Sequence, residues 1–349
     1  MTIVDPGSVG SNITTLSKSV NSNRRTNMSS GENSRQLVVL DVDGGVDDAQ
    51  AMMLALTHPH VQVLGITCVA GNVKVNQVCQ NVLRVLKVFG RPEVPVFAGA
   101  SVSLLGTHVD ACHYLGQDGM GDVPDPDPPS ADLVQSEHAV SALLRLSKEY
   151  PDEINLVATG PLTNLALAVR TDPGFPARLR KLTLMGGNIH GLGNVTPSAE
   201  YNFWCDPEAA HVVLEGYRSL FPITVVPWET CVQDHDISWD TWMDICAIPT
   251  KRGQFHAAIQ QQMIAKQKQH RLFSAHFHTY DLYAVAVALF PEVLYKTLEV
   301  YARVELKGEI TRGQMVCDYN DKWGKHPNVR VVKKLDLPSV LNMLRRALE

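Results

Sequence analysis

The sequence predicts an α/β protein built on an open, mostly parallel sheet with helices on both faces. Short β-branched or apolar runs alternate with longer stretches of helical spacing, the pattern produced by strand–helix–strand units. Most runs are continuously apolar, as expected of parallel strands that are buried on both faces. The composition agrees, because 45% of the 349 residues are hydrophobic and 19% are charged, values typical of a globular protein.

The apolar runs give the strands in chain order. The predicted strands are Leu37–Leu40, Val63–Cys68, Val94–Phe97, Ile154–Ala158, Lys181–Met185, Ile223–Val226 and Val300–Glu305. Between most of them apolar residues recur at helical spacing, which predicts the helices Asp48–Leu56, Asn76–Phe89, His138–Glu149 and Pro207–Leu214. Residues 230–280 contain no convincing strand, so we expect helices there, most clearly over Gln254–His270, forming a cap near the site.

The first 36 residues differ from the rest of the chain. They are rich in Ser, Asn and Thr, contain no aromatic residue, and cannot bury enough apolar surface to offset the entropy lost on ordering. We therefore predict a disordered tail over 1–36 and a single domain over 37–349. Four basic residues against two acidic ones leave an organelle-targeting segment as the alternative to an untargeted extension.

Charge and cysteine content exclude several classes of protein. The formal net charge of −5 argues against a nucleic-acid partner, which would require a basic excess to neutralise phosphates. No apolar run approaches the roughly 20 residues needed to cross a membrane. The seven cysteines are scattered, odd in number and without a Cys-x-x-Cys pair, so we expect reduced thiols in the cytoplasm rather than disulfides or a zinc site.

A cluster of aspartates follows the first predicted strand. Its four carboxylates lie within eight residues, at Asp41, Asp43, Asp47 and Asp48. They would repel one another unless positive charge lay among them. The N-terminus of the following helix supplies part of that charge, and a divalent cation would supply the rest. Oxygen ligands without Cys or His favour Ca²⁺ or Mg²⁺.

The cluster has three other interpretations. Helix capping by Asp47, with solvated acids around it, does not explain Asp41 or Asp43. An EF-hand loop would need a bidentate glutamate at its twelfth position, which is Met52 here. A haloacid-dehalogenase-type phosphatase, with Asp41 as phosphoryl acceptor and Asp43 as acid/base, matches the first four residues but gives the last two aspartates no role.

Further motifs follow in order, and together they resemble the inosine-uridine-preferring nucleoside hydrolases. The cluster itself reads Asp-x-Asp-x-Gly-x-Asp-Asp. The later segments are Val69–Asn72, Gly116–Asp122, Ala158–Ala166, Met185–Asn188, Gly193–Pro197, Ala199–Asn202, Asp206–Ala210 and Tyr280–Asp281. The resemblance implies a Rossmann-like nucleoside hydrolase fold and the hydrolysis of ribonucleosides to free base and ribose.

The resemblance also implies a calcium site and a mechanism. The calcium ligands would be Asp43, Asp48, the backbone carbonyl of Thr159, and Asp281. Ribose hydroxyls and a water would complete the oxygen shell that Ca²⁺ prefers. Asp43 would act as the general base toward the metal-bound water, so no covalent intermediate is expected.

Ribose recognition is implied in the same way. The residues that would contact the ribose are Asp47, Asn72, Asn194, Glu200 and Asn202, with Met185 packing beneath it. Amide and carboxylate side chains provide the donors and acceptors that hydroxyl groups require. The expected partners are a small ribonucleoside and further copies of this chain, in a homodimer or homotetramer.

The base side of the site departs from the family pattern. Tyr280 stands where many members have a histidine that protonates the leaving base, so Tyr280 and the nearby His278 are the candidates for that role. Leu115 replaces another common histidine, with His113 two residues upstream. Gly44 replaces the usual proline, as in a purine-type relative, which favours purine nucleosides slightly.

Two further alternatives concern the base. Trp228, Trp239 and Trp242 would stack on a base if residues 230–280 cap the pocket, and core packing is the alternative role for each. Because the base-protonating histidine is missing, a nucleoside-binding protein with little or no turnover is the alternative function.

Overall fold

The computed structural model describes residues 35–349 apart from 218–220, 234 and 272–273. The tail predicted over 1–36 lies outside the described residues except for its last two, and Gln36 already begins the first strand. Within the described part of the chain, no helix is both long enough and apolar enough to cross a membrane.

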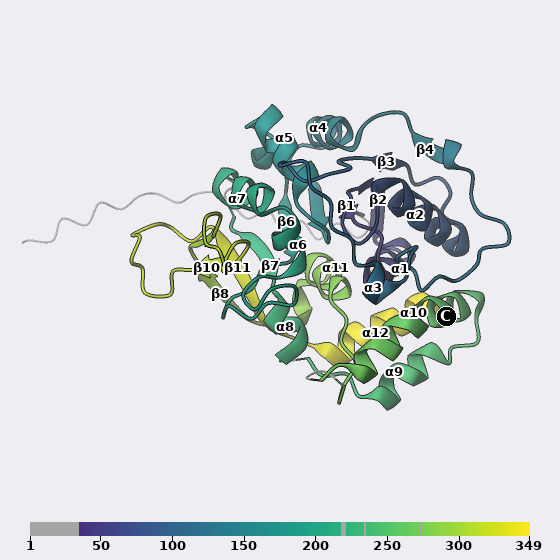
Figure 1. The fold of residues 1–349 in the computed structure, drawn as a ribbon. Coiled ribbons are helices and arrows are strands. Elements are labelled where there is room, and N and C mark those ends of the chain that lie inside the picture. The colour runs from purple at the N-terminus through teal and green to yellow at the C-terminus, as the bar shows by residue number, and fades with distance from the viewer. Residues whose placement is uncertain (1–34, 218–220, 234, 272–273) are drawn as a thin grey trace, which may run out of the picture. The chain divides into compact units, whose positions relative to one another are not determined.

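A nine-stranded sheet organises residues 35–349 (Figure 1). Its strands are Gln36–Val42 (β1), Val61–Cys68 (β2), Val96–Ala98 (β3), Val134–Gln135 (β4), Ile154–Ala158 (β5), Lys181–Met185 (β6), Ile223–Val226 (β7), Leu294–Val300 (β8) and Val329–Leu335 (β11). The order is β4-β3-β2-β1-β5-β6-β7-β11-β8, and only the β11–β8 pair is antiparallel among its described strands. Ala302–Val304 (β9) and Met315–Cys317 (β10) form a separate antiparallel pair. The mostly parallel sheet predicted from the sequence is confirmed.

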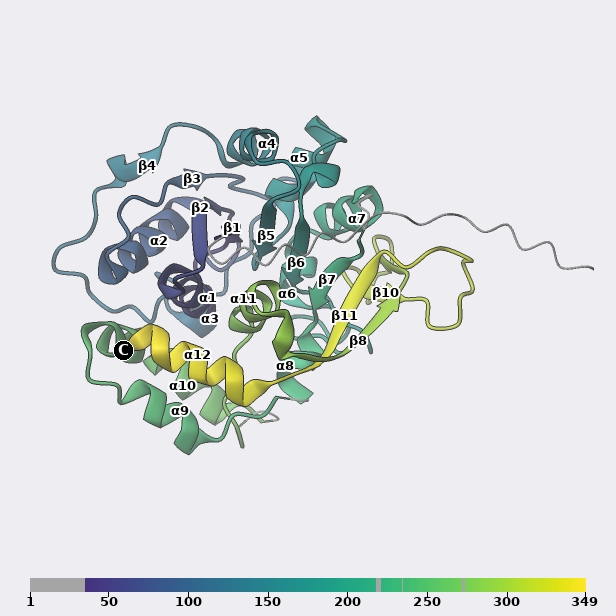
Figure 2. The same ribbon diagram turned by 180° about the vertical axis from the view of Figure 1, so that it is seen from behind.

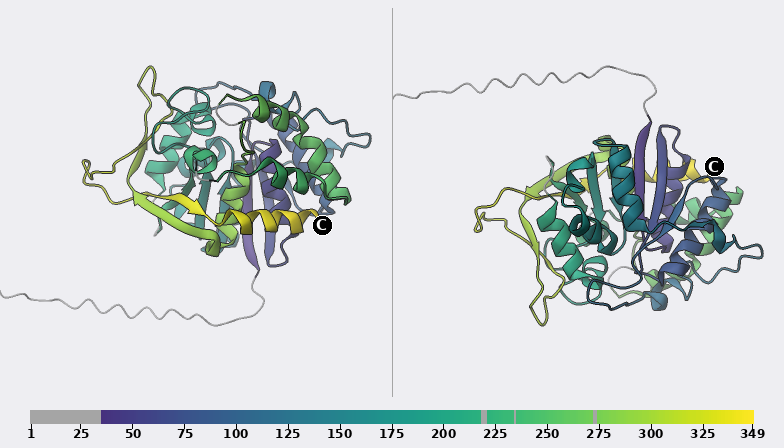
Figure 3. Two further views of the ribbon diagram at one scale, coloured as in Figure 1. Left: turned by 90° about the horizontal axis from the view of Figure 1, so that it is seen from below. Right: turned by 90° about the horizontal axis from the view of Figure 1, so that it is seen from above.

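Helices cover both faces of this sheet. They are Val46–Thr57 (α1), Val75–Phe89 (α2), Cys112–Leu115 (α3), Ala139–Glu149 (α4), Thr163–Thr171 (α5), Tyr201–Cys205 (α6), Pro207–Gly216 (α7), Trp228–Gln233 (α8), Trp239–Cys246 (α9), Lys251–Gln269 (α10), Asp281–Leu289 (α11) and Leu337–Leu348 (α12). Figures 1 and 3 show α4, α5 and α7 on one side of the sheet and α11 and α12 on the other. Seen from behind, α12 lies in front of α10, and α9 lies below them (Figure 2).

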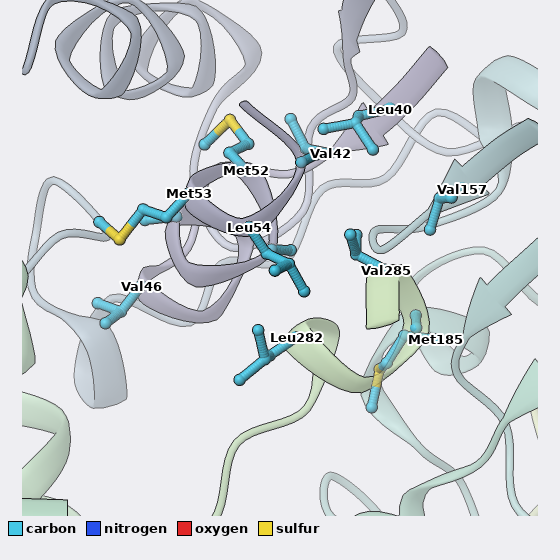
Figure 4. Close-up of a cluster of buried hydrophobic side chains, with 14 of the residues drawn as sticks. Leu40, Val42, Val46, Met52, Met53, Leu54, Val157, Met185, Leu282 and Val285 are labelled. Atoms are coloured by element: carbon cyan, nitrogen blue, oxygen red, sulfur yellow. The ribbon is translucent and has the colours of Figure 1, made fainter. Parts of the chain in front are cut away.

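The alternation of side chains along the strands explains why both faces are covered. In β1, Leu40 packs into the hydrophobic cluster of α1 and α11, whereas Val39 packs into that of α4, α5 and α7. In Figure 4, Leu54 of α1 points toward Leu282 and Val285 of α11. All of these side chains are almost fully buried. The packing of α11 against α1 brings the start of α11 to the carboxyl end of β1.

The strand order reverses at β1. The chain runs outward from β1 through β2, β3 and β4, then returns through β5 and continues to β6 and β7 on the other side. Loops that leave the two sides of such a reversal part from each other, and this opens a crevice at the carboxyl ends of the strands. The loops that follow β1, β2 and β5 therefore lie around this crevice.

Most predicted strands are confirmed, and one is wrong. Strands β5, β6 and β7 agree with the prediction at both ends. The single strand predicted over Val300–Glu305 does not form, because β8 ends at Val300, β9 begins at Ala302, and the two belong to different sheets. The prediction also omits β4, β10 and β11 and all of β8 except its last residue. The start of β11 is nevertheless as rich in valine as the predicted strands.

The helices expected between residues 230 and 280 are confirmed as α9 and α10, with α8 at the start of the region. Trp242 is fully buried and stacks on Phe277, with ring centroids 3.9 Å apart and an interplanar angle of 13°. This tryptophan therefore packs in the core. Trp228 has a different environment, which belongs to the site.

Candidate active site

Asp43, Gly44 and Gly45 form the turn between β1 and α1. Gly44 has a φ of +75°, and a Cβ atom there would lie 2.9 Å from the Cα atom of Val78, so the turn requires glycine. The Gly45 amide donates to Asp48 Oδ2 at 2.8 Å. This bond directs the Asp48 carboxylate back into the turn, beside Asp43.

Asn72, in the loop after β2, holds the Asp43 carboxylate. Its backbone amide donates to Oδ2 and its side-chain Nδ2 donates to Oδ1, both at 2.8 Å. The loop approaches this closely because residue 71 is glycine. A Cβ atom on Gly71 would lie 2.1 Å from Asp43 Oδ2 and 2.7 Å from Pro161 Cδ. Asp43 is fully buried, and Asn72 fixes the orientation of its carboxylate.

Thr159, in the loop after β5, and Asn202, in α6, extend the polar cluster. The Thr159 hydroxyl donates to Asp48 Oδ1 at 2.6 Å. The Thr159 carbonyl accepts from Asn202 Nδ2 at 2.9 Å, and its second lone pair can accept from or bind another group. Asn202 Nδ2 also lies 3.2 Å from the Met185 carbonyl oxygen, so the structure brings Met185 and Asn202 together.

Asp281, the first residue of α11, completes an acidic group with two residues of α1. Asp47, Asp48 and Asp281 are buried, and each offers an oxygen within 4.8 Å of the others. Asp43 lies within hydrogen-bonding reach of Asp48. The structure thus gathers all the carboxylates that the resemblance assigned to calcium. It adds Asp47, which the resemblance assigned to the ribose.

Burial dominates the electrostatics of this acidic group. It raises the pKa of all four carboxyls above the ordinary value, to about 7 for Asp47. The negative charge of Asp48 raises the pKa of Asp43, Asp47 and Asp281 further. Ionising four closely spaced carboxyl groups in a buried site is costly in free energy, so the group needs either protons or a cation.

The donor set fits a metal ion. It consists entirely of oxygen atoms, which hard divalent cations prefer. Asp47 Oδ1 is buried and has no hydrogen-bond partner among the described residues. A buried carboxylate oxygen without a partner is unfavourable unless a ligand satisfies it. Asp47, Asp48 and Asp281 can therefore hold a metal ion, with Asp43 alongside.

Glu200 lies beside Asn202, whereas Asn194 lies apart. The Glu200 carboxylate caps α6 by accepting from the backbone amides of Asn202 and Phe203, at 2.8 and 3.1 Å. It also accepts from the Gly187 amide, after β6, at 2.8 Å. Burial raises the pKa of Glu200 to about 7, against the effect of these bonds. Asn194 is exposed in the loop between β6 and α6. No described contact joins its side chain to the other predicted site residues.

Tyr280 directly precedes Asp281 and packs against Trp228 of α8. Their ring centroids are 4.9 Å apart, at an interplanar angle of 33°. The Tyr280 hydroxyl hydrogen-bonds to Tyr114 of α3, and Gln267 Nε2 of α10 lies 3.5 Å from it. Burial, and then the neighbouring Tyr114, raises the pKa of Tyr280 well above its ordinary value. Its hydroxyl is therefore a neutral hydrogen-bonding group at physiological pH.

His278, the other candidate for the leaving base, has a different orientation. Its Nδ1 lies 3.3 Å from the Cys231 carbonyl oxygen of α8, and burial lowers the pKa of the ring. Tyr114 and Gln267, which surround Tyr280, were not predicted as site residues from the sequence. Tyr114 adjoins the glycine-rich segment that begins at Gly116, and this position could have indicated it. The helical pattern of α10 does not distinguish Gln267 from its other glutamines.

Asp41 lies in β1, beneath the acidic group. It is fully buried, and one of its oxygens accepts from both the Thr67 hydroxyl and Asn164 Nδ2. A phosphoryl acceptor must meet its substrate directly. The position of Asp41 therefore does not suit the phosphatase interpretation.

Known proteins are similar to this chain in sequence and fold. A family model described as inosine-uridine preferring nucleoside hydrolase matches residues 38–342. The inosine-uridine preferring nucleoside hydrolase of Leishmania major is 34% identical over 324 residues, covering 89% of this chain and 97% of that protein. The pyrimidine-specific ribonucleoside hydrolase RihA of Salmonella paratyphi C is 32% identical over 320 residues, covering 89% and 98%. The solved structure of an inosine-guanosine nucleoside hydrolase aligns with a TM-score of 0.81 at 32% identity, covering 90% and 98%.

Proposed function

Because the chain belongs to the inosine-uridine preferring nucleoside hydrolase family, we propose that it cleaves ribonucleosides with a water activated by Asp43. The bond between C1′ of the ribose and the base nitrogen breaks as the water oxygen bonds to C1′, which yields free base and ribose. The observation that carries this proposal is the buried Asp43, held through both oxygens by Asn72 beside the acidic group. A carboxylate held in this way is placed to accept the proton of the attacking water.

The proposed metal is calcium, held by Asp47, Asp48 and Asp281 together with Asp43 and the Thr159 carbonyl. When bound, calcium would acidify a water and bind ribose hydroxyls. The residues of the chain supply the rest of the chemistry. Their negative charge stabilises the positive charge that develops on the ribose as the glycosidic bond breaks.

The proposed ribose contacts are Asp47, Asn72, Asn194, Glu200 and Asn202, above Met185. Support is strongest for Asp47, whose Oδ1 has no partner among the described residues. The Asn194 loop would have to bring its exposed side chain to the ribose. A site that pairs its polar groups with ribose hydroxyls disfavours deoxyribose, because those groups would be left without partners.

On the base side, the proposed residues are Tyr280 and, less directly, His278. The pair of Tyr280 and Trp228 offers aromatic surface and a neutral hydroxyl next to the acidic group. An aromatic surface of this kind suits a purine, so we propose a modest preference for purine nucleosides. Relatives are named for both preferences, since one is pyrimidine-specific and another acts on inosine and guanosine.

The proposed setting is the cytoplasm, and the proposed assembly is a homodimer or homotetramer. All seven cysteines carry free thiols, which suits a reducing compartment.

The test is ribose release from inosine, adenosine, guanosine, uridine and cytidine by the calcium-loaded protein, with 2′-deoxyinosine alongside. We expect release from at least one ribonucleoside, faster for the purines, and little from the deoxynucleoside. Binding of a nucleoside without release of ribose would instead support the nucleoside-binding alternative. Faster release from uridine and cytidine would overturn the purine preference and leave the hydrolase activity standing.

The close packing around Asp43 gives a separate expectation. Gly71→Ala should lower kcat for the preferred nucleoside at least about ten-fold, because the added methyl group must displace Asp43 or Pro161. Gly216→Ala is the matched control, since its Cβ atom would meet only a methyl group of Val169, at 2.9 Å. Melting temperatures would be measured for both variants. A Gly71→Ala enzyme with the wild-type kcat would contradict a fixed orientation of Asp43.

A further inference from the structure

Gln267 lies in the last turn of α10 and is 1% exposed. Its side-chain amide pairs with the backbone of His278 on the neighbouring segment. Oε1 accepts from the His278 amide at 2.8 Å, and Nε2 donates to the His278 carbonyl, also at 2.8 Å. The same Nε2 lies 3.5 Å from the hydroxyl oxygen of Tyr280. One side chain therefore satisfies both backbone groups of His278 and reaches the phenol two residues later.

The hydroxyl of Tyr280 has a second neighbour, Tyr114 of α3. Tyr114 hydrogen-bonds to both Tyr280 and Gln267, so three side chains from separate elements form one hydrogen-bonded group. Trp228 packs on the ring of Tyr280. The charge of Asp47 acts on both phenols, which places the group on the Asp47 side of the site. Among these residues, Trp228 orients the ring and Gln267 and Tyr114 orient the hydroxyl.

We propose that Gln267 is a positioning residue for the leaving base, because it holds Tyr280 so that the phenol hydroxyls of Tyr280 and Tyr114 face that base. The inference rests on the proposed function and deepens it. A glutamine that donates to the Tyr280 oxygen turns the hydroxyl hydrogen away from itself, toward Tyr114 or the base. The described hydrogen bonds of Gln267 reach His278, Tyr280 and Tyr114, so it acts through the tyrosines rather than on the ribose.

Two substrates with different leaving groups test this role. When a nucleoside is cleaved, its base departs as a basic anion unless hydrogen bonds or a proton stabilise it. When p-nitrophenyl β-D-ribofuranoside is cleaved, p-nitrophenolate departs, and this stable anion needs no such assistance. Gln267→Met, which keeps the side-chain length but removes the amide, should lower kcat for the preferred nucleoside at least about ten-fold. The kcat for the nitrophenyl riboside should stay within about two-fold of wild type, a split that lost stability alone would not produce.

Four further variants complete the experiment. Gln267→Glu keeps the acceptor for the His278 amide but loses both N–H donors. It should therefore also lose activity on the nucleoside and not on the nitrophenyl riboside. This variant replaces Gln267→Met in the test if the methionine variant folds poorly. Tyr280→Phe should show the split as well. The double variant Gln267→Met/Tyr280→Phe should lose less activity on the nucleoside than the product of the two single losses, because both changes disturb the same hydrogen-bonded group. Gln261→Met, at an exposed position of the same helix, is the control for the substitution itself.

Several results would overturn the inference. Equal losses on both substrates would mean that Gln267 supports the ribose or metal side of the site. If the fold-loss of kcat in the double variant equalled the product of the two single losses, Gln267 would not act through Tyr280. Wild-type activity in both Gln267 variants would show that the hydrogen-bonded group is not needed. If the wild-type protein hydrolysed neither substrate, the proposed function would fail, and this inference with it.

Discussion

Asp43→Asn should lower the rate of ribose release by about a thousand-fold, within the 10²- to 10⁴-fold range typical of a lost general base. The amide cannot accept the proton of the attacking water. It also presents an N–H group to one of the two Asn72 donors that now bind the carboxylate, so it loses a hydrogen bond as well. The measurement is kcat at saturating calcium and nucleoside, with the melting temperature recorded to show that the variant is folded.

Asp41→Asn is the matched control for this change. The oxygen of Asp41 that accepts from Thr67 and Asn164 can remain an oxygen in the amide, and the other oxygen has no partner among the described residues. We therefore expect kcat to stay within about ten-fold of wild type. The phosphatase interpretation requires the opposite order, with Asp41 indispensable. If the Asp43→Asn variant kept more than a tenth of the wild-type rate, Asp43 would not be the general base.

Asp281→Asn should abolish turnover at ordinary calcium concentrations and stabilise the metal-free protein. The change removes one carboxylate of the acidic group, so calcium affinity should fall by more than the roughly 10- to 100-fold lost when groups next to metal ligands are changed. Calorimetric titration with calcium measures the affinity. An unchanged affinity would exclude Asp281 from the metal site.

The stability effect of Asp281→Asn depends on pH, and its sign follows from the direction of the pKa shifts. Burial and the neighbouring aspartates raise the pKa of Asp281 well above its value in the unfolded chain, so the folded protein holds this proton more tightly. That stabilisation is complete below about pH 4 and is lost as the pH rises toward the raised value. In the presence of a chelator, Asp281→Asn should therefore melt above wild type at pH 8, and the difference should shrink at pH 5. A variant that melted lower at pH 8 would contradict mutual repulsion within the group.

The sequence predicts those features that depend on local pattern. Continuous apolar runs gave β5, β6 and β7, and the placement of polar residues after strands indicated where the site lies. The predicted strand over Val300–Glu305 failed for a tertiary reason. The residue pattern continues through Tyr301, yet β8 pairs with β11 while β9 pairs with β10, and local pattern carries no information about pairing partners.

The same division holds at the site. The aspartate cluster, Thr159 and Asp281 could be named in advance because motifs mark them. Gln267 could not, since its hydrogen bonds are made to the backbone of His278, which is not adjacent to it in sequence. Asn81 is a second example. Its Nδ2 donates to the carbonyl oxygens of Gly44 and Asp118, at 2.8 and 2.6 Å, and so ties the turn of the site to another loop.

The placement of Asp281 also has a consequence for how the chain acquires its site. Asp43, Asp47 and Asp48 are neighbours in sequence, whereas Asp281 reaches them only after α11 has docked on α1. Closing so long a loop is a costly, non-local event in folding. Calcium that binds the finished group but not the unfolded chain would draw the equilibrium toward complete assembly. A nascent chain that has not yet reached residue 281 has three crowded acids and no fourth, so we expect a metal ion to bind tightly only after synthesis has passed that residue.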